Sequence, residues 1–443
     1  MASTLRAVEF YSGIGGMHYA LKSCGVAVNV VAAIDINTIA NEVYAHNFPN
    51  TVLLNRNIEG IKLEEFKKFD ADIFTMSPPC QPFTRQGNKK ASDDPRTKSF
   101  LHIMKVLRSL PKPPSYILME NVKGFEVSET REEFIRTLRE TNYAFQEFLL
   151  SPMQFGVPNS RLRYFLIAVH KPLQFPFKES DSIMEHLSTS LGSSSLSFDP
   201  TSSLLIKDNP RLHCPVCNQQ SNELLRHSIP SSTETTNSKI QDAKEENPCS
   251  TLIDVKCERT SSTEKKRGLE STLPSEKVDE ELCHNDMNDC DRMWARIKNI
   301  QHFLEDKRDH YEEFSLPENI LKKKVLLMDI VQTKCNHSCC FTKGYGHYAE
   351  GTGSILQMSF SDVTQSSSIF ERYKDAREEE RIRILAPLGL RYFTPREIAN
   401  ILCFPAEFGF PKNVTTRQRY RLLGNSLNIL VVKELMKKVF FDE

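Results

Sequence analysis

Residues 6–16 read RAVEFYSGIGG, an apolar run that leads into three closely spaced glycines. This pattern is typical of a buried strand that ends in a tight turn before a helix. The alternation then repeats: GGMHYALKSCG (15–25) has helical spacing, NVVAAIDIN (29–37) resembles a second strand, and TIANEVYAHNF (38–48) a second helix. Strands that alternate with helices predict a parallel sheet covered by helices on both faces.

The same alternation continues to about residue 170. ADIFTMS (71–77), SYILMENV (115–122) and RLRYFLIAVH (161–170) are further apolar runs, and SFLHIMKVLRSL (99–110) has helical spacing. We therefore predict an α/β fold with a doubly wound, mostly parallel sheet. Ligands of such sheets bind at the carboxyl ends of the strands, where functional residues are expected.

The bulk composition is that of an ordinary soluble chain. It has 443 residues, of which 39% are hydrophobic and 26% charged, enough for two or three domains. No apolar run approaches the roughly 20 residues of a membrane span, and the first residues lack the layout of a secretory signal. We expect a cytoplasmic protein, with the nucleus left open, and no membrane partner. The twelve cysteines are then expected to be free thiols rather than disulfides.

Residues 178–290 differ in character from the rest of the chain. They are rich in Ser and Thr and carry a net charge of −8, which leaves +8 on the remainder. Such a segment buries too little apolar surface to fold, so we predict a disordered insert. Cys214 and Cys217 have the spacing of half a zinc site, but no second pair follows, and we expect no metal. The basic remainder suits a nucleic-acid partner.

Order is expected to return after the insert. RMWARIKNIQHFLEDKRDHYEEF (292–314) has the pattern of an amphipathic helix. TPREIANILCFP (394–405) predicts another helix, with Thr394 as its N-cap and Pro395 and Glu397 in its first turn.

The glycines at 13, 15 and 16 would let backbone amides approach a ligand at the start of the first helix. Asp35 ends the second strand, where its carboxylate could accept both hydroxyls of a ribose. Taken alone, this pattern suits either a nucleotide site or a plain tight turn, and a dinucleotide oxidoreductase is one alternative. That alternative leaves the next motif unexplained.

The next motif, SPPCQPF (77–83), places Cys80 among three prolines at the end of the third apolar run. Prolines fix the backbone and donate no amide hydrogen, so this loop is irregular and rigid. A thiol held there could be a small buried residue, but its place at the ligand-binding edge favours a nucleophile.

Glu120 ends the run YILM at the same edge, where apolar surroundings favour a protonated carboxyl. Arg161 and Arg163 share one face of a strand. This set fits methylation of a cytosine ring: the thiolate adds to carbon 6, Glu120 protonates nitrogen 3, an arginine steadies the ring carbonyl, and carbon 5 attacks a methyl group. The base must be unstacked to be reached.

These motifs resemble the DNA (cytosine-5) methyltransferase family, and they occur in the family's order: FYSGIGG, Asp35, SPPCQPF, ENVKGF, NSRLRYF, RYFTPREIANILCFP and LLGNSLN. Within the family the chain is most similar to the type 2 homologue branch, which methylates transfer RNA. CFTKGYGHYAEGTGS (340–354) carries that likeness. The resemblance covers residues 5–170 and about 295–440.

The resemblance implies an S-adenosylmethionine-dependent methyltransferase fold with a smaller target-recognition domain. It makes Cys80 the nucleophile, has Glu120 bind and protonate the base, and has Arg161 and Arg163 contact it. The residues implied to line the S-adenosylmethionine pocket are Ile14, Gly15, Gly16, Asp35, Ile58, Glu59, Ser77, Asn425 and Ser426. The expected domains are residues 1–177 and 388–443 for catalysis, 178–290 for the insert and 291–387 for target recognition.

The expected reaction is methylation of carbon 5 of a cytosine in tRNA, in the anticodon loop of aspartate tRNA, through a covalent cysteine adduct. We expect a monomer in which Phe341, Lys343 and Tyr345 contact the RNA. Weak activity on DNA stays open. The alternatives are a DNA cytosine-5 methyltransferase and an inactive nucleic-acid-binding homologue. One departure from the family concerns Asn159 and Ser160, which stand where the family has Gln-Asn and put support of the arginine loop in question.

Overall fold

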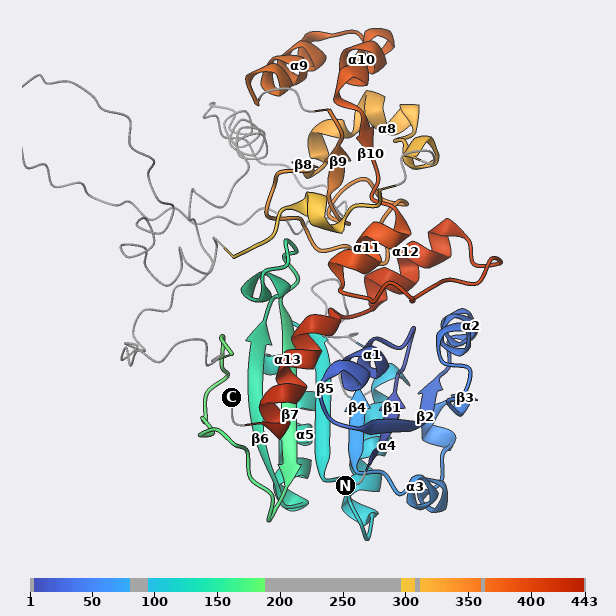
Figure 1. Ribbon diagram of the computed structural model, residues 1–443, viewed down its shortest axis with the longest axis vertical. Coiled ribbons are helices and arrows are strands. Elements are labelled where there is room, and N and C mark those ends of the chain that lie inside the picture. The colour runs from blue at the N-terminus through green and yellow to red at the C-terminus, as the bar shows by residue number, and fades with distance from the viewer. Residues whose placement is uncertain (1–3, 80–94, 188–295, 307–310, 360–362, 442–443) are drawn as a thin grey trace, which may run out of the picture. The chain divides into compact units, whose positions relative to one another are not determined.

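The computed structural model describes residues 4–79, 95–187, 296–306, 311–359 and 363–441 (Figure 1). Cys80, Cys214, Cys217 and nearly all of the expected insert lie outside these residues. All described residues except Arg296 belong to one compact unit.

Seven strands form the central sheet in the order β3-β2-β1-β4-β5-β7-β6. They are β1 (Leu5–Phe10), β2 (Val28–Asp35), β3 (Leu53–Asn55), β4 (Ile73–Met76), β5 (Tyr116–Val122), β6 (Tyr143–Leu150) and β7 (Arg163–His170). The first five in spatial order are parallel, and β7 is antiparallel to both of its neighbours. The predicted mostly parallel, doubly wound sheet is confirmed. Strand order reverses between β1 and β4, which places a ligand crevice at their carboxyl ends.

Helices cover both faces of this sheet. Neighbouring residues of β1 belong to different apolar clusters: Ala7 packs with one and Val8 with the other. The first cluster includes α1 (Gly16–Ser23), α2 (Thr38–Asn47) and α13 (Ile429–Phe440), and the second α3 (Leu63–Phe69), α4 (Pro95–Ser109) and α5 (Glu129–Glu140). Helix α13 therefore returns from the C-terminus and packs beside α1 (Figure 1).

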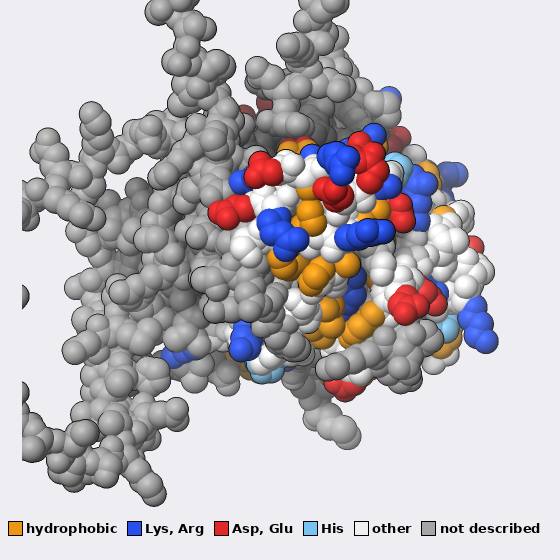
Figure 2. All heavy atoms as spheres, turned by 90° about the horizontal axis from the view of Figure 1, so that it is seen from above, with side chains coloured by type: hydrophobic (Ala, Val, Ile, Leu, Met, Phe, Trp, Pro, Cys, Tyr) orange, Lys and Arg blue, Asp and Glu red, His pale blue; other side chains and the backbone are white. Residues whose placement is uncertain are grey.

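A second, three-stranded sheet combines two strands from the region assigned to target recognition, 291–387, with one strand from the part assigned to catalysis, 388–443. Its order is β10-β9-β8, formed by β8 (Ile330–Gln332), β9 (Ile355–Gln357) and β10 (Leu390–Arg391). The helices around and after it are α8 (Glu318–Lys323), α9 (Val363–Asp375), α10 (Glu378–Leu385), α11 (Pro395–Ile401) and α12 (Thr416–Asn425). Seen from the end with α9 and α10, this region mixes acidic and basic side chains around apolar ones (Figure 2).

Short 3-10 helices occupy several connections: η1 (Ile58–Gly60), η2 (Phe125–Val127), η3 (Pro152–Phe155), η6 (Ile300–Phe303), η7 (Tyr311–Phe314), η8 (Val325–Leu327) and η9 (Ala386–Leu388). Throughout the described stretches, each helix is too short or too polar to span a bilayer. No group of three or more His, Cys, Asp or Glu side chains among the described residues could hold a metal ion.

The amphipathic helix predicted over 292–314 is wrong for the part that the structure describes. That part contains only η6 and η7. Backbone amides of this stretch pair with other segments instead: Ile300 donates to the carbonyl of Cys335 at 2.8 Å and Gln301 to that of Thr333 at 2.9 Å. Hydrogen bonds to distant segments have overridden the local helical pattern.

The first residues of the expected insert are attached to the sheet. Met184 forms a bridge with Phe148 of β6, and its amide donates to the carbonyl of Glu147 at 2.9 Å. The side-chain amide of Gln146 donates to the carbonyl of Ser182 at 3.0 Å. Residues 180–187 thus cover the exposed edge of β6, which would otherwise offer unpaired backbone groups. The insert's expected boundary at residue 178 falls just before this edge segment.

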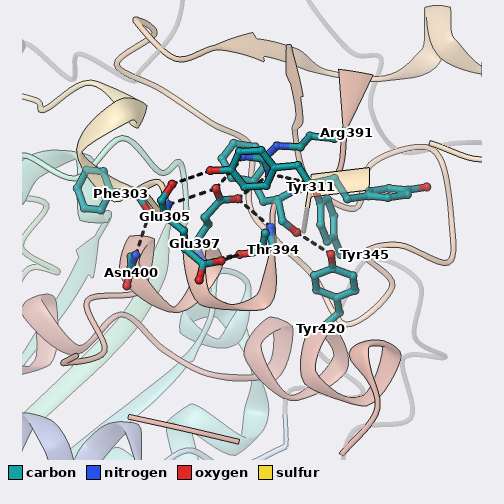
Figure 3. A network of polar contacts seen from close by, with 11 residues as sticks. Phe303, Glu305, Tyr311, Tyr345, Arg391, Thr394, Glu397, Asn400 and Tyr420 are labelled. Carbon is teal, nitrogen blue, oxygen red and sulfur yellow. Dashed lines mark hydrogen bonds and ion pairs between the residues drawn. The ribbon is translucent and has the colours of Figure 1, made fainter. Parts of the chain in front are cut away.

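A buried polar network joins β10 to α11 (Figure 3). Glu397 is 0% exposed and Arg391 2% exposed, and two guanidinium nitrogens reach the two carboxylate oxygens at 2.8 and 2.7 Å. Thr394 caps α11 as predicted, and its amide donates to Glu397 at 2.8 Å. The ring of Tyr311 lies 3.9 Å from the Arg391 guanidinium carbon. The two buried charges therefore pair with each other.

Glu397→Gln should lower the free energy of unfolding by about 3 kcal/mol, because it leaves the buried Arg391 charge without its counter-ion. Glu380→Gln is the matched control, since it removes an exposed carboxylate paired with Arg377 and should change stability little. Urea denaturation of both variants measures the difference. Equal stability of the two would show that the buried pair does not hold β10 to α11.

Candidate active site

The turn after β1 has a geometry that requires glycine. Gly13 and Gly15 have φ values of 52° and 84°, a region that side chains disfavour. A Cβ on Gly15 would lie 2.4 Å from a ring carbon of Phe48. The Gly13 amide donates to Asp35 at 2.9 Å, which ties the end of β1 to the end of β2.

The surroundings of this turn fit a nucleoside-containing ligand. Ser12 is buried, and its hydroxyl finds no hydrogen-bond partner in the described part of the chain. Burial raises the pKa of the Tyr11 hydroxyl, its hydrogen bond to Ser99 opposes this effect, and the negative charges of Glu59 and Asp35 raise the pKa further. Ile36 is 69% exposed beside Asp35. An exposed apolar side chain can pack against the flat face of a base, and the neighbouring carboxylate can bind the ribose.

The other residues expected in this pocket differ in their contacts and in their exposure to solvent. Gly16 lies against the last motif, since a Cβ there would be 3.3 Å from the Ser426 hydroxyl. Ile14 and Ile58 are buried, Ser77 is half-buried, and Glu59 and Asn425 are exposed. The structure thus brings Gly15, Gly16, Asp35, Glu59 and Ser426 to one edge of the sheet. The sequence analysis missed Tyr11 and Ile36, although both flank residues that it named.

The end of β5 faces the motif that carries Cys80. Asn121 is buried, and its amide donates to the carbonyl of Pro78 at 3.4 Å. Cys80 itself lies outside the described residues. Pro78 is two residues before Cys80, so this bond places the last described residues before the cysteine next to the end of β5.

Glu120 sits in the environment that an acid requires. Burial raises the pKa of its carboxyl, and the positive charges of Arg163 and Arg161 only partly oppose that effect. The Arg163 Nε atom lies 3.5 Å from Glu120 Oε1. A raised pKa keeps the proton on the carboxyl to higher pH, so Glu120 can donate it to a ring nitrogen.

The two arginines have different surroundings, which corrects the expectation that both contact the base. Arg161 is 3% exposed, and it donates to the carbonyls of Phe341 at 3.0 Å and Gly424 at 3.1 Å and to that of Ser426. Its two terminal nitrogens are directed at protein acceptors, whereas its Nε is buried without a partner among the described residues. Arg163 is half-buried beside Glu120, so only Arg163 is placed to reach a bound base.

Cys340 is a second thiol at this site, and the sequence analysis gave it no role. Its sulfur lies 3.2 Å from Arg161 Nη1 and 3.7 Å from Arg163 Nη2. Burial alone would raise the pKa of the Cys340 thiol, but the two arginine charges outweigh it and lower the pKa. No local sequence pattern indicates this contact, because the residues are 177 or more positions apart.

Asn159 supports the loop that carries the two arginines, although the family has a different residue at this position. Its side-chain amide donates to the Ser338 hydroxyl at 3.1 Å and to the Cys339 carbonyl at 2.9 Å. The Ser160 amide donates to the Ser338 carbonyl at 2.8 Å. The arginine loop is therefore supported directly by the segment before Cys340.

Two of the three residues expected to contact nucleic acid are buried. Phe341 is 1% and Tyr345 2% exposed, and their rings pack edge to face at 5.1 Å. The Tyr345 hydroxyl donates to the Ser354 carbonyl at 2.7 Å. Neither ring has a face for a base to stack on, so that expectation is wrong for both. Lys343 is exposed and stays a candidate.

The arrangement of Glu120, Arg163 and the glycine turn at the ends of parallel strands can be compared with known proteins. Residues 5–440 match the family described as C-5 cytosine-specific DNA methylase. The chain belongs to this family. It is accordingly a cytosine C5 methyltransferase that uses S-adenosyl-L-methionine, and the turn around Gly15 and Asp35 is the place that fits this cofactor.

The similarity extends over almost the whole chain. A human relative named tRNA (cytosine(38)-C(5))-methyltransferase is 44% identical over 436 residues, 98% of this chain and 99% of the relative. A Dictyostelium discoideum relative named DNA (cytosine-5)-methyltransferase is 37% identical over 442 residues, 98% and 93% of the two chains. The crystal structure of a Spodoptera frugiperda DNMT2 mutant has a TM-score of 0.69 at 34% identity and covers 99% of this chain and 100% of that one.

The methylation rate should fall as pH rises through the folded-state pKa of Glu120, because only the protonated carboxyl can donate to the base. The same sign applies to stability: a folded-state pKa above the unfolded value favours folding at low pH and loses that contribution as pH rises. Glu120→Gln should lower kcat by about 100-fold and abolish this limb of the profile. An unchanged limb in the variant would assign it to another group.

Arg161→Ala and Arg163→Ala should separate structure from chemistry. Arg161→Ala leaves buried carbonyls without donors and should lower the free energy of unfolding by about 3 kcal/mol. Arg163→Ala should leave stability and cofactor affinity near wild type while lowering kcat/KM about 100-fold. Thermal unfolding, cofactor titration and single-turnover methylation measure all three quantities. If both variants changed stability, cofactor affinity and kcat/KM alike, the assignment of a structural role to Arg161 and a substrate-binding role to Arg163 would be contradicted.

Proposed function

We propose that this methyltransferase modifies carbon 5 of a cytosine in tRNA, and that the target lies in the anticodon loop of aspartate tRNA. The observation that carries the proposal is the chain-long similarity to relatives named tRNA (cytosine(38)-C(5))-methyltransferase, combined with the acid and arginine at the rim of the sheet.

The proposed reaction passes through a covalent adduct with the base. The Cys80 thiolate forms a bond to carbon 6, and the electron pair displaced from the ring is balanced by a proton from Glu120 at nitrogen 3. Arg163 donates to the ring carbonyl, whose negative charge grows in this step. Carbon 5 is then nucleophilic, and the cofactor supplies an electrophilic methyl group there. Methyl transfer would release S-adenosylhomocysteine. A water molecule would then take the proton from carbon 5 while the bond from carbon 6 to sulfur breaks and the thiolate leaves, and nitrogen 3 would return its proton to Glu120.

The base must leave its stack before this thiol can reach carbon 6. An unpaired cytosine in an RNA loop is already free of a partner strand, whereas a base in a duplex must also be unpaired, at a cost of a few kcal/mol. Loops are the sites that sequence-specific RNA-binding proteins recognise. These considerations support a loop cytosine as the target.

The alternative substrate is DNA, and the Dictyostelium discoideum relative named DNA (cytosine-5)-methyltransferase supports it. The two substrates differ in what the enzyme must do: a duplex requires base flipping, and a loop does not. A binding protein without activity is the third candidate. One experiment separates all three.

The wild-type protein should methylate an aspartate tRNA anticodon stem-loop at least tenfold faster than duplex DNA of the same sequence at matched salt, since unpairing a base costs a few kcal/mol. Labelled cofactor and single-turnover kinetics give both rates. Cys80→Ala should abolish transfer with cofactor affinity unchanged, because carbon 5 is not nucleophilic until carbon 6 is attacked. Equal rates on duplex and stem-loop would contradict the RNA assignment, and no transfer to either would favour a binding protein.

A further inference from the structure

One segment runs from Arg161 and Arg163 to the surface. Cys340 contacts Arg163, and the next residue accepts a hydrogen bond from Arg161. The following backbone is pressed against α12, since a Cβ on Gly424 would lie 2.2 Å from the Thr342 carbonyl carbon and 2.3 Å from the Lys343 nitrogen. The position of this segment is therefore fixed relative to the active site.

The segment ends in two exposed rings. Tyr348 is 63% exposed and is the one tyrosine among the exposed large apolar side chains of the described residues. His347 is also exposed, and the two ring centroids are 4.5 Å apart at 58°. A soluble protein gains nothing in stability from leaving such a ring in water.

The backbone that carries these rings is well ordered by hydrogen bonds. The amides of His347 and Tyr348 both donate to the carbonyl of Gly344 at 3.0 Å, and the Thr352 hydroxyl donates to the Tyr348 carbonyl at 2.9 Å. Gly346 has φ of 73°, and a Cβ there would lie 3.0 Å from the Tyr420 ring. The turn is held against α12, so a ligand that stacks on the rings orders little additional chain.

Basic residues outnumber acidic ones in the two segments that meet at the rings, where Glu350 is the exposed acidic residue near Tyr348 in sequence. The Arg417 guanidinium donates to His347 Nε2 at 3.3 Å. Residues 411–428 contain four basic and no acidic residues, and Lys343, Lys412, Arg417 and Arg421 are exposed. The face at α9 and α10 mixes both signs of charge (Figure 2). The charge around His347 and Tyr348 therefore suits a phosphate backbone better than that face does.

We propose that Tyr348 and His347 form a stacking platform for an unpaired base beside the target cytosine, with Arg417 contacting the adjacent backbone. The inference rests on the proposed function, because it assumes an RNA loop at the active site. Every base has a ring face, and aromatic side chains next to cations bind unpaired bases through it. A base inside an intact duplex presents only its edges, so the platform favours loops over duplexes.

The test uses full-length protein and RNA stem-loops with one loop cytosine, in which 2-aminopurine replaces each other loop nucleotide in turn. Stacking on an aromatic ring quenches the fluorescence of 2-aminopurine. Wild type should quench strongly at one position, and Tyr348→Phe should retain that quenching. Tyr348→Leu keeps apolar bulk without a ring, so it should lose the quenching and bind RNA roughly tenfold more weakly.

Matched controls separate the platform from general effects. Phe441→Leu removes an aromatic ring exposed to 38% elsewhere, and Arg377→Ala removes an exposed arginine on the other charged face. Both should bind RNA as wild type does, whereas Arg417→Ala should weaken binding and flatten its salt dependence.

The two readouts keep this proposal distinct from the proposed function. Fluorescence and affinity require no catalysis, so failure of wild type to methylate the stem-loop would reject the RNA substrate and leave the platform measurable. The platform is overturned if Tyr348→Leu matches wild type in quenching and affinity. It is also overturned if Tyr348→Leu weakens binding to duplex DNA by the same factor, because a duplex offers no free base to stack.

Discussion

The guanidinium of Arg161 holds together parts of the chain that are 179 to 265 residues apart. It lies two residues before β7 and donates to carbonyls in the last turn of α12, directly after α12 and at Phe341. Removing an arginine from water is costly unless its nitrogens are hydrogen-bonded. Here the acceptors are backbone carbonyls and a thiol rather than a carboxylate. The active-site rim therefore exists only when all three segments are assembled.

This dependence reaches the cofactor side as well. Ser426, whose carbonyl accepts from Arg161, lies against Gly16 at the start of α1. The same turn leads into α13, which packs beside α1 on the central sheet. One buried cation thus connects the base-binding rim, the recognition segment and the glycine turn. The sequence suggests a catalytic role for Arg161 because it lies two positions from Arg163. Its contacts, however, connect separate segments of the chain and so are structural.

Much of the fold could be predicted, because buried parallel strands occur in the sequence as continuous apolar runs. The glycine turn and the stretches with helical spacing separate these runs from one another. The strand-end residues Asp35 and Glu120 were predictable for the same reason, since the end of a parallel strand fixes their edge of the sheet. The stretch at 292–314 was not, because its backbone pairs with segments such as Thr333 and Cys335 that local spacing does not reveal. Phe341 and Tyr345 were misassigned because their burial comes from packing against Phe393, far along the chain.

Cys340 and Ile36 show the other limit of sequence reasoning. Ile36 is adjacent to a predicted residue, and only its exposure distinguishes it from a core side chain. Cys340 gains its place from the Asn159–Ser338 contact, which no repeat or spacing in the sequence encodes.

The contacts of Arg163 explain how an acid can coexist with two cations. Each guanidinium opposes protonation of Glu120, so two unshielded arginines at this rim would favour the ionised carboxylate. Arg163 is shared between Glu120 and Cys340, and Arg161 is turned toward carbonyls. The arginine charges lower the pKa of the Cys340 thiol, and a thiolate there would offset their effect on the carboxyl. The surroundings that raise the pKa of Glu120 thus lie next to a guanidinium that remains available to a ring carbonyl, which is the combination that the proposed addition to carbon 6 requires.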